Sequence, residues 1–391
     1  MASTPDGNDP PESSDRAPGE PGAAWPPADL PAGLLKDSFA HMMTDPRASM
    51  EYFFADLFAR SPDLRALFPS SMTAVKVRFF AAVARLAWTT SPPGNCIAFL
   101  DELSRSHRKF GVREQHYAPF FAALLATVRH CCGPQWTDET RTAWERALTY
   151  AELTMLAAAR RDEESQPPWW LGEVTSHDRR SGGIAVLTTR PDQPLAYSPG
   201  QNVDVQVPRW PRQWRSYSVA SAPRPGGDFD LHVRAIPGGR VSNTLVHHAR
   251  VGDTIALGAA RGDMTLSPAG DSDLLCIAGG TGLAPVKVIT EAVIKAAGSR
   301  AAGSRAAGSP DRAITVLFGA RRRAELYDLD SLQQLAASYP ALTVIPVVSA
   351  EPGFGGQKGL LPDVAAARDD LAACDISSAV RPPWWRGPSG C

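Results

Sequence analysis

The sequence lacks a hydrophobic run long enough to cross a membrane. An α-helical span needs about 20 consecutive apolar residues, and Arg78 and Arg85 interrupt the best candidate. The sequence also lacks the basic and then apolar N-terminal segment of a secretory signal. We therefore expect a cytoplasmic protein that does not associate with membranes.

Cysteine pairs and a strong net charge are lacking as well. The six cysteines show neither a Cys-x-x-Cys nor a zinc-binding spacing, which fits a reducing compartment. The formal net charge is −1 at pH 7, which argues against nucleic acid or an anionic membrane as the main partner. We expect small-molecule partners and a monomer or a dimer.

The chain has 391 residues, which is too long for one ordinary domain. Residues 1–30 are rich in Pro, Gly, Asp, Glu and Ser, and they have too few apolar side chains to offset the entropy of ordering, which predicts a disordered segment. Residues 31–163 carry apolar side chains at helical spacing, with breaks at proline and no strand period. They predict an all-α domain, followed by a linker at 162–168.

Two further domains are expected after the linker. Apolar residues then recur with a period of two, in short runs separated by Gly, Pro and Asp, which predicts a closed antiparallel β-barrel over 164–268. Over 269–391 apolar strands alternate with helical segments, which is typical of α/β with a parallel sheet. The expected strands are 184–189, 203–207, 230–236, 254–257, 274–278, 314–318 and 342–348, and the expected helices are 285–297 and 324–336. A short repeat at 296–310 predicts a solvated loop.

A glycine-rich turn joins the expected strand at 274–278 to the expected helix. Free backbone N–H groups and the positive end of a helix dipole favour a pyrophosphate at such a turn, and glycine lets the backbone approach it. The candidate dinucleotide-binding residues are Gly280, Thr281, Gly282, Leu283, Ala284 and Pro285. A purely structural turn between strand and helix is the alternative.

Three arginines, Arg321–Arg323, follow the next expected strand. They could meet the ribose 2′-phosphate of NADPH, or they could form a solvated basic turn. The sequence leaves both NADH and NADPH open.

The stretch Arg215-Ser216-Tyr217-Ser218 has the groups that a flavin needs. An arginine can pair with a flavin phosphate, a tyrosine can lie against the flat ring, and a serine can hydrogen-bond the ring edge. The segment 238–243 adds backbone N–H groups and small polar side chains for the pyrophosphate. Its candidates are Gly239, Val241 and Ser242. An ordinary strand with one buried tyrosine is the alternative.

These motifs follow one another in a characteristic order. Pro-Gly-Gln, Arg-x-Tyr-Ser, Gly-Gly-x-Val-Ser-Asn and Gly-Gly-Thr-Gly-x-x-Pro together resemble the ferredoxin-reductase-type FAD/NAD(P)H module over about residues 170–350. The resemblance implies hydride transfer from nicotinamide to flavin.

His107 ends an amphipathic helical stretch in the first domain. A lone histidine on an apolar helical face is more often a packed core residue than a metal ligand, but Phe68 is an aromatic that could pack on a porphyrin. Joined to a flavin reductase, the domain resembles the globin of the flavohaemoglobins. The resemblance makes His107 the axial haem ligand, Tyr117 its supporting tyrosine and Phe68 the aromatic at the haem edge.

That family resemblance also implies cofactors and a reaction. The cofactors are haem b, FAD and NAD(P)H, and electrons pass from NAD(P)H through FAD to haem. Dioxygen then oxidises nitric oxide to nitrate.

The chain departs from the family at several positions. The family's distal Tyr falls at Phe54 and its distal Gln near Val75, which we place in the haem pocket, while Tyr52 would point elsewhere on a helix. The proximal glutamate falls near Arg161, and the aromatic after Pro-Gly-Gln is Asn202. Without a distal donor, bound oxygen loses a hydrogen bond of roughly 1.5–3 kcal/mol. A haem-based oxygen or redox sensor, or a binding protein with weak or no dioxygenase turnover, is therefore the alternative.

The C-terminus departs further. The module carries a Gly-Pro-Pro-x-Met strand end beside the nicotinamide, whereas this chain reads Arg-Pro-Pro-Trp-Trp-Arg at 381–386. Bases that encode Pro-Trp-Trp read Met-Val-Ala when shifted by one, and the run 380–386 shifts into Gly-Pro-Pro-Ala-Met-Val-Ala. We hypothesise a frameshift near Ser377. The expected result is a truncated or frameshifted NAD(P)-binding domain that lacks a sheet strand and part of its nicotinamide site.

Overall fold

The computed structural model describes residues 31–88, 93–265, 272–302, 312–368 and 375–379. The chain divides into two compact units, and the second begins at Trp169. The expected disordered segment 1–30 and the run 380–386 on which the frameshift hypothesis rests lie outside the described residues.

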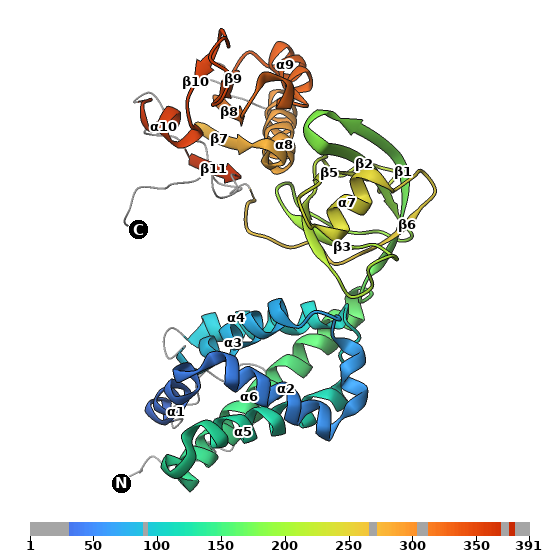
Figure 1. Ribbon diagram of the computed structural model, residues 1–391. Coiled ribbons are helices and arrows are strands. Elements are labelled where there is room, and N and C mark those ends of the chain that lie inside the picture. The colour runs from blue at the N-terminus through green and yellow to red at the C-terminus, as the bar shows by residue number, and fades with distance from the viewer. Residues whose placement is uncertain (1–30, 89–92, 266–271, 303–311, 369–374, 380–391) are drawn as a thin grey trace, which may run out of the picture. The chain divides into compact units, whose positions relative to one another are not determined.

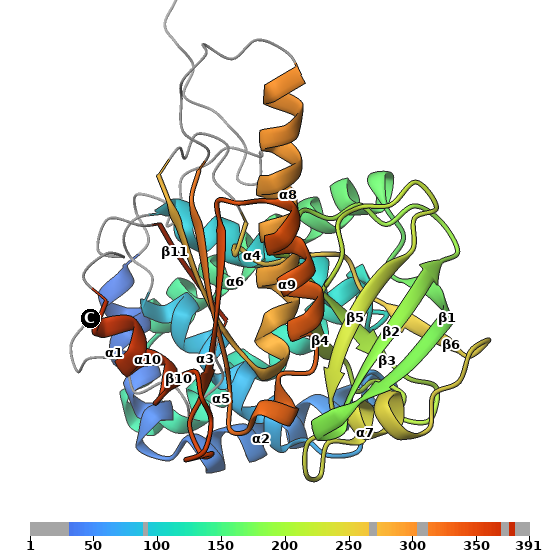
Figure 2. The ribbon, with the colours of Figure 1, turned by 90° about the horizontal axis from the view of Figure 1, so that it is seen from above.

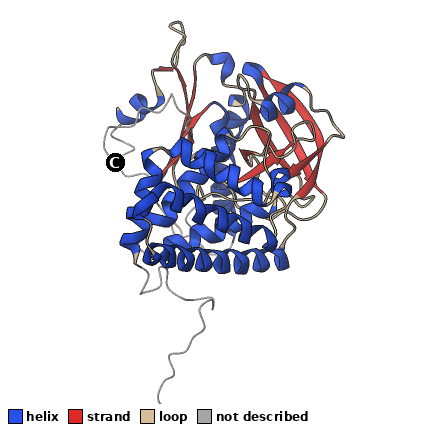
Figure 3. Ribbon diagram, turned by 60° about the horizontal axis from the view of Figure 1, so that its bottom comes forward, coloured by secondary structure: helices blue, strands red, loops and turns tan. Residues whose placement is uncertain are grey.

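The first unit is helical throughout its described part (Figure 1, Figure 3). Its α-helices are α1 (Ala32–Thr44), α2 (Pro46–Arg60), α3 (Thr73–Trp88), α4 (Pro93–Arg108), α5 (Tyr117–Cys132) and α6 (Asp138–Ser165). Local chemistry sets several of these bounds. Asp45 caps α2 by accepting from the backbone N–H of Ala48 at 2.9 Å, and Gly133, with a φ of 52°, ends α5.

One apolar core joins the helices of this unit. It holds the fully buried Phe39, Phe53 and Trp144. The indole N–H of Trp144 donates to Ser38 Oγ at 2.8 Å, so the one polar atom of that buried ring is satisfied. The expected all-α domain is confirmed.

Helix α6 runs to Ser165, into the stretch where the sequence predicted a linker. The polar run stays helical because Asp162 is buried, and its carboxylate accepts from Gln166 Nε2 at 2.5 Å. The sequence analysis missed this contact because a stretch rich in Asp and Glu is typical of an exposed linker.

The second unit begins with a six-stranded antiparallel barrel of strand order β4-β3-β6-β1-β2-β5. Its strands are β1 (Trp170–Arg180), β2 (Ile184–Pro191), β3 (Asn202–Gln206), β4 (Arg215–Ser218), β5 (Phe229–Arg234) and β6 (Thr254–Leu257). A bridge between Val219 and Leu231 connects the end of β4 to β5, which closes the sheet. The expected barrel is confirmed, and one helix that the sequence did not predict, α7 (Arg240–His247), packs Val241 and Leu245 into its core.

A parallel sheet of order β10-β9-β8-β7-β11 follows. Its strands are β7 (Leu274–Gly279), β8 (Ile314–Ala320), β9 (Leu342–Val348), β10 (Gln357–Lys358) and β11 (Asp375–Ala379). Helices α8 (Leu283–Ala302) and α9 (Leu329–Ser338) lie beside one face and α10 (Leu361–Ala366) beside the other (Figure 2). Cys276 faces the α8 side and Ile277 faces the α10 side, as alternation along a strand requires.

Two features of this sheet differ from expectation. Helix α8 continues to Ala302, into the expected solvated loop. Strand β11, which the sequence did not predict, pairs in parallel with β7, from Asp375 opposite Leu274 to Ala379 opposite Ala278. No helix among the described residues is both long and apolar enough to cross a membrane.

Candidate functional site

His107 lies in the last turn of α4. Burial, the larger cause, and the charge of Lys109 lower the pKa of its imidazole from the usual value to about 4. The ring is therefore neutral at physiological pH, and a neutral imidazole is the form that binds a metal. A single neutral histidine suits a haem iron, because the porphyrin supplies the in-plane ligands.

Tyr117, the first residue of α5, connects to α4 through a serine. Its hydroxyl is hydrogen-bonded to Ser104, and Ser104 Oγ donates to the backbone carbonyl of Met155 on α6 at 2.5 Å. This chain of bonds fixes the helix one turn before His107, and the sequence did not single out Ser104.

The carboxylate near Tyr117 is Glu152 on α6, whose charge contributes to raising the pKa of the tyrosine, although burial is the larger cause. Burial also raises the pKa of Glu152 itself. The sequence had placed the family's glutamate near Arg161, but that side chain is 54% exposed and pairs with Asp101. The sequence signal for Glu152 is its spacing. Met155 lies on the buried face of α6, and a residue three positions earlier on a helix lies close to that face.

The other residues that the sequence placed in the haem pocket are apolar or aromatic. Phe54 is 5% exposed, and its ring meets Phe68 edge-on at 5.6 Å between centroids. Val75 packs on the same core. Tyr52 stacks on the His130 ring at 4.1 Å, so its hydroxyl is not the donor that a Tyr at position 54 would provide. A cluster of phenylalanines and a neutral histidine in one helical domain fit haem.

No group of three or more His, Cys, Asp or Glu side chains gathers as a metal site within the described ranges.

In the second unit, β4 brings the Arg-Ser-Tyr-Ser stretch beside β3. Tyr217 is 8% exposed and packs in the barrel core opposite Val203. Ser216 Oγ donates to Asn202 Oδ1 at 2.6 Å, so the residue after Pro-Gly-Gln is tied to the flavin stretch by a hydrogen bond and not by an aromatic ring. Arg215 is exposed, and its guanidinium donates to the carbonyl of Trp214 at 2.8 Å.

The Gly-Gly turn before α7 offers backbone N–H groups. Gly239 is the N-cap of α7, and a Cβ there would lie 2.5 Å from Ser242 Oγ, so only glycine fits. No side chain caps this end of the helix. Asn243 Nδ2 donates to the carbonyls of Ile236 and Gly239, which stabilises the turn. The Val241 side chain is buried, which leaves its backbone N–H as the group that can meet a phosphate.

The second glycine-rich turn follows β7. Gly280 has a φ of 56°, which favours glycine. Leu283, Ala284 and Pro285 are buried and pack the start of α8, so their contribution to a ligand is the position of the backbone. The guanidinium of Arg234, from barrel strand β5, lies 3.1 Å from where a Cβ of Gly280 would be. A cation at a pyrophosphate-type turn suits a dinucleotide.

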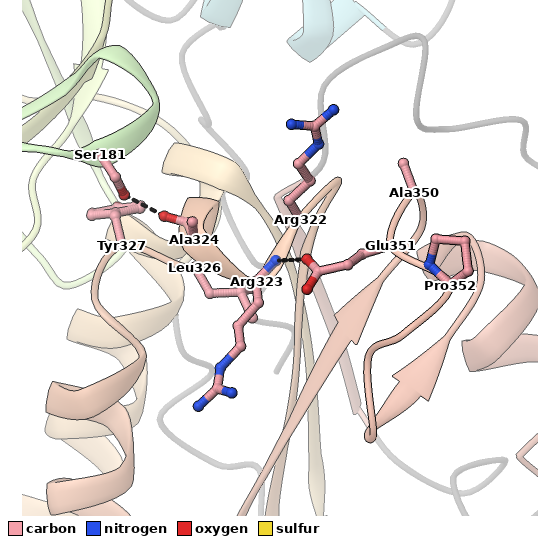
Figure 4. Close-up of a pocket in the computed structure, with 9 residues that line it drawn as sticks. All are labelled: Ser181, Arg322, Arg323, Ala324, Leu326, Tyr327, Ala350, Glu351 and Pro352. Carbon is pink, nitrogen blue, oxygen red and sulfur yellow. Dashed lines mark hydrogen bonds between the residues drawn. The ribbon is translucent and has the colours of Figure 1, made fainter.

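A pocket of about 850 Å³ lies at the carboxyl ends of β8 and β9 (Figure 4). Arg322 and Arg323 line it and point in different directions, and Glu351 accepts from the backbone N–H of Arg323 at 2.8 Å. Ser181, from the barrel, donates to the carbonyl of Ala324 at its edge. In open α/β sheets, dinucleotides lie along the carboxyl ends of the strands.

Comparison with known proteins identifies three domains in the chain. The globin model matches residues 51–154, the oxidoreductase FAD-binding domain matches 173–265, and the oxidoreductase NAD-binding domain matches 276–373. The ferredoxin–NAD(P)(+) reductase component of the naphthalene 1,2-dioxygenase system of Pseudomonas putida is 34% identical over 194 residues, which cover 49% of this chain and 55% of that protein. The chain spans about half the length of such reductases.

Two further relatives extend into the helical unit. The flavohemoprotein of Bordetella pertussis is 29% identical over 272 residues, which cover 65% of this chain and 68% of that protein. The flavohemoglobin of Malassezia yamatoensis, solved with bound FAD and haem, matches 89% of each chain with a TM-score of 0.67 at 16% identity, a likeness of fold.

The folds and the matched models define the class: a globin fused to the FAD-binding and NAD-binding domains of an oxidoreductase. Its cofactors are haem, FAD and a nicotinamide dinucleotide. In its order of domains the chain is similar to the Bordetella flavohemoprotein and, in fold, to the Malassezia flavohemoglobin.

Proposed function

We propose that the chain is an NAD(P)H-dependent flavohaem oxidoreductase that oxidises nitric oxide to nitrate with dioxygen, with FAD and haem supplying the electron transfer. The observation that carries the proposal is the neutral His107 in a globin domain whose core is rich in phenylalanine, on the same chain as two glycine turns suited to nucleotides. The names of the Bordetella and Malassezia relatives support it.

Each site residue has a defined task in this proposal. His107 would hold the iron, and Tyr117 would keep the end of α4 in place through Ser104. Arg215 and the N–H groups before α7 would hold the flavin phosphates, with Tyr217 against the ring. The turn at Gly280 would hold the dinucleotide.

The apolar distal wall favours a second function. Phe54 offers no hydrogen-bond donor, and Tyr52 is stacked on His130. A haem-based oxygen or redox sensor, whose reductase only sets the oxidation state of iron, needs no such donor. We keep this as the second candidate.

One assay separates the two functions. The full chain, loaded with haem and FAD, is mixed with NADPH or NADH in air, with and without nitric oxide. Rapid dinucleotide oxidation that depends on nitric oxide and yields nitrate is the expected result. Haem reduction without nitric oxide consumption favours the sensor, and absence of haem reduction contradicts both functions.

A His107→Ala variant is the matched control. It should lose the Soret band of axially ligated haem while its flavin is still reduced by NAD(P)H. Unchanged axial ligation in this variant would show that another residue binds the iron.

A further inference from the structure

A buried polar cluster joins the barrel to the parallel sheet within the second unit. His232 on β5 is 5% exposed, and its Nδ1 lies 2.7 Å from the hydroxyl of Tyr327, which is 8% exposed. The next residue, Asp328, is buried and accepts from Lys287 Nζ on α8 at 2.7 Å and from Ser331 Oγ at 2.8 Å. The cluster thus connects one barrel strand to two helices of the dinucleotide-binding domain.

The two rings are held as a neutral pair. Burial, the largest cause, lowers the pKa of His232 and raises the pKa of Tyr327 well above its usual value. A hydrogen bond between a neutral donor and a neutral acceptor avoids the free-energy cost of burying a charge. The imidazole and phenol rings also meet edge-on, with 5.5 Å between their centroids.

The position of the pair connects three ligand-binding segments. Strand β5 leads from His232 into the Gly-Gly turn before α7. Tyr327 follows the arginine turn after β8 and lines the pocket there. Lys287 lies on α8, just after the turn at Gly280. A shift at this contact would therefore move the two glycine turns relative to each other.

Other contacts flank the pair at this interface. Ser181 Oγ donates to the carbonyl of Ala324 nearer the surface, and Arg234 and Glu325 lie 4.0 Å apart. Ile184 of the barrel packs into the apolar core of the α/β domain. Apolar packing is non-directional, whereas a hydrogen bond fixes both distance and orientation.

We propose that His232 and Tyr327 are positioning residues for hydride transfer, and that their hydrogen bond fixes the dinucleotide-binding domain at the separation from the flavin barrel at which the hydride passes. This inference rests on the proposed NAD(P)H-to-flavin reaction. Neither residue need touch the flavin or the dinucleotide.

The test is anaerobic stopped-flow reduction of the flavin in the full chain by NADPH and by NADH. Tyr327→Phe removes one hydroxyl, and His232→Leu removes the partner. Each should lower the limiting rate of flavin reduction about tenfold or more, because a misplacement of about 1 Å can cost two orders of magnitude. The dinucleotide concentration at half-saturation and the FAD content should stay unchanged, a split that a general loss of stability would not produce.

Three comparisons sharpen the test. The double variant should be no slower than either single variant, because both changes break the same bond. His232→Asn, which keeps a hydrogen-bonding atom near the position of Nδ1, should recover most of the rate. Tyr339→Phe is the matched control, since Tyr339 is equally buried and its hydroxyl donates to the carbonyl of Arg312 within the α/β domain.

The outcomes are distinguishable. A wild-type rate in Tyr327→Phe, slowing factors that multiply in the double variant, or loss of FAD from Tyr327→Phe would each overturn the positioning role while the proposed function stands. A wild-type chain that carries FAD but is not reduced by either dinucleotide would overturn the proposed function, and the inference with it.

Discussion

Arg108 and Asp162 form a buried ion pair between the end of α4 and the last turns of α6. Their side chains are 10% and 8% exposed, and Arg108 also donates to the carbonyl of Gln166 at 3.1 Å. Arg108 directly follows His107 in the chain. The pair therefore holds the turn that carries the candidate haem ligand against the longest helix of the domain.

Removal of the carboxylate should destabilise the globin. Asp162→Ala leaves a buried guanidinium without its anion, which costs about 3–5 kcal/mol. We expect the full chain to lose haem at a lower urea concentration, which the Soret absorbance measures. The iron–histidine vibration should also shift. Arg161→Ala, at the neighbouring residue, breaks an exposed pair with Asp101 and should cost about 1 kcal/mol or less. Equal urea midpoints for the two variants would contradict a role for the buried pair.

A distal hydroxyl should slow oxygen release. Phe54→Tyr adds a donor at the position where the flavohaemoglobin resemblance places a distal tyrosine, and a charge-assisted hydrogen bond contributes about 1.5–3 kcal/mol. That energy corresponds to oxygen dissociation about 10- to 150-fold slower and to slower autoxidation, both measurable by stopped-flow absorbance. Phe58→Tyr adds the same hydroxyl one helical turn later, on a ring that also meets Phe68. It should leave the dissociation rate near that of the wild type.

The sequence predicted the fold class well because the spacing of apolar residues along helices and strands can be read from one sequence. Strands β6 and β9 lie where the apolar pattern put them, at Thr254–Leu257 and Leu342–Val348. Helix α7 was missed because it has only eight residues and begins within a glycine motif. Strand β11 was missed because Asp375–Ala379 is short and partly polar, and its parallel pairing with β7 is a long-range contact.

The sequence could propose site residues only where one residue type is required at one position. His107 and the two glycine turns are of this kind. Ser104, Glu152 and the His232–Tyr327 pair were not, because their roles depend on which helix or strand lies opposite. Ser104, one turn before His107, can be recognised as a positioning residue only once the fold shows its contacts with Tyr117 and with the carbonyl of Met155.

Arg322 should influence the choice of dinucleotide. It lines the pocket beyond β8, where an arginine can meet a ribose 2′-phosphate. Arg322→Ala should raise the KM for NADPH about tenfold or more, the loss of one charge-assisted hydrogen bond, and change the KM for NADH little. Steady-state flavin-dependent reduction of ferricyanide measures both constants. An equal rise for the two dinucleotides would place the guanidinium outside the phosphate site.

Acid should weaken the second unit through His232. Burial is the main cause that lowers the pKa of its imidazole to about 4, and it outweighs the neighbouring charges. Lys287 and Arg180 act in the same direction as burial, whereas Asp328 and Asp230 oppose it. The folded state therefore holds this ring neutral in a range where the unfolded chain does not.

The sign of the pH effect follows from the two protonation states. In the unfolded chain the imidazole pKa returns to about 6.5. Between pH of about 6.5 and 4 the unfolded state binds a proton that the folded state does not, so stability falls as the pH is lowered through this window and is constant above it. FAD fluorescence on acidification reports release from the barrel. Release should rise more steeply between pH of about 6.5 and 4 in the wild type than in His232→Asn, which keeps the contact but cannot titrate, and identical profiles would show that His232 does not set the acid stability of this unit.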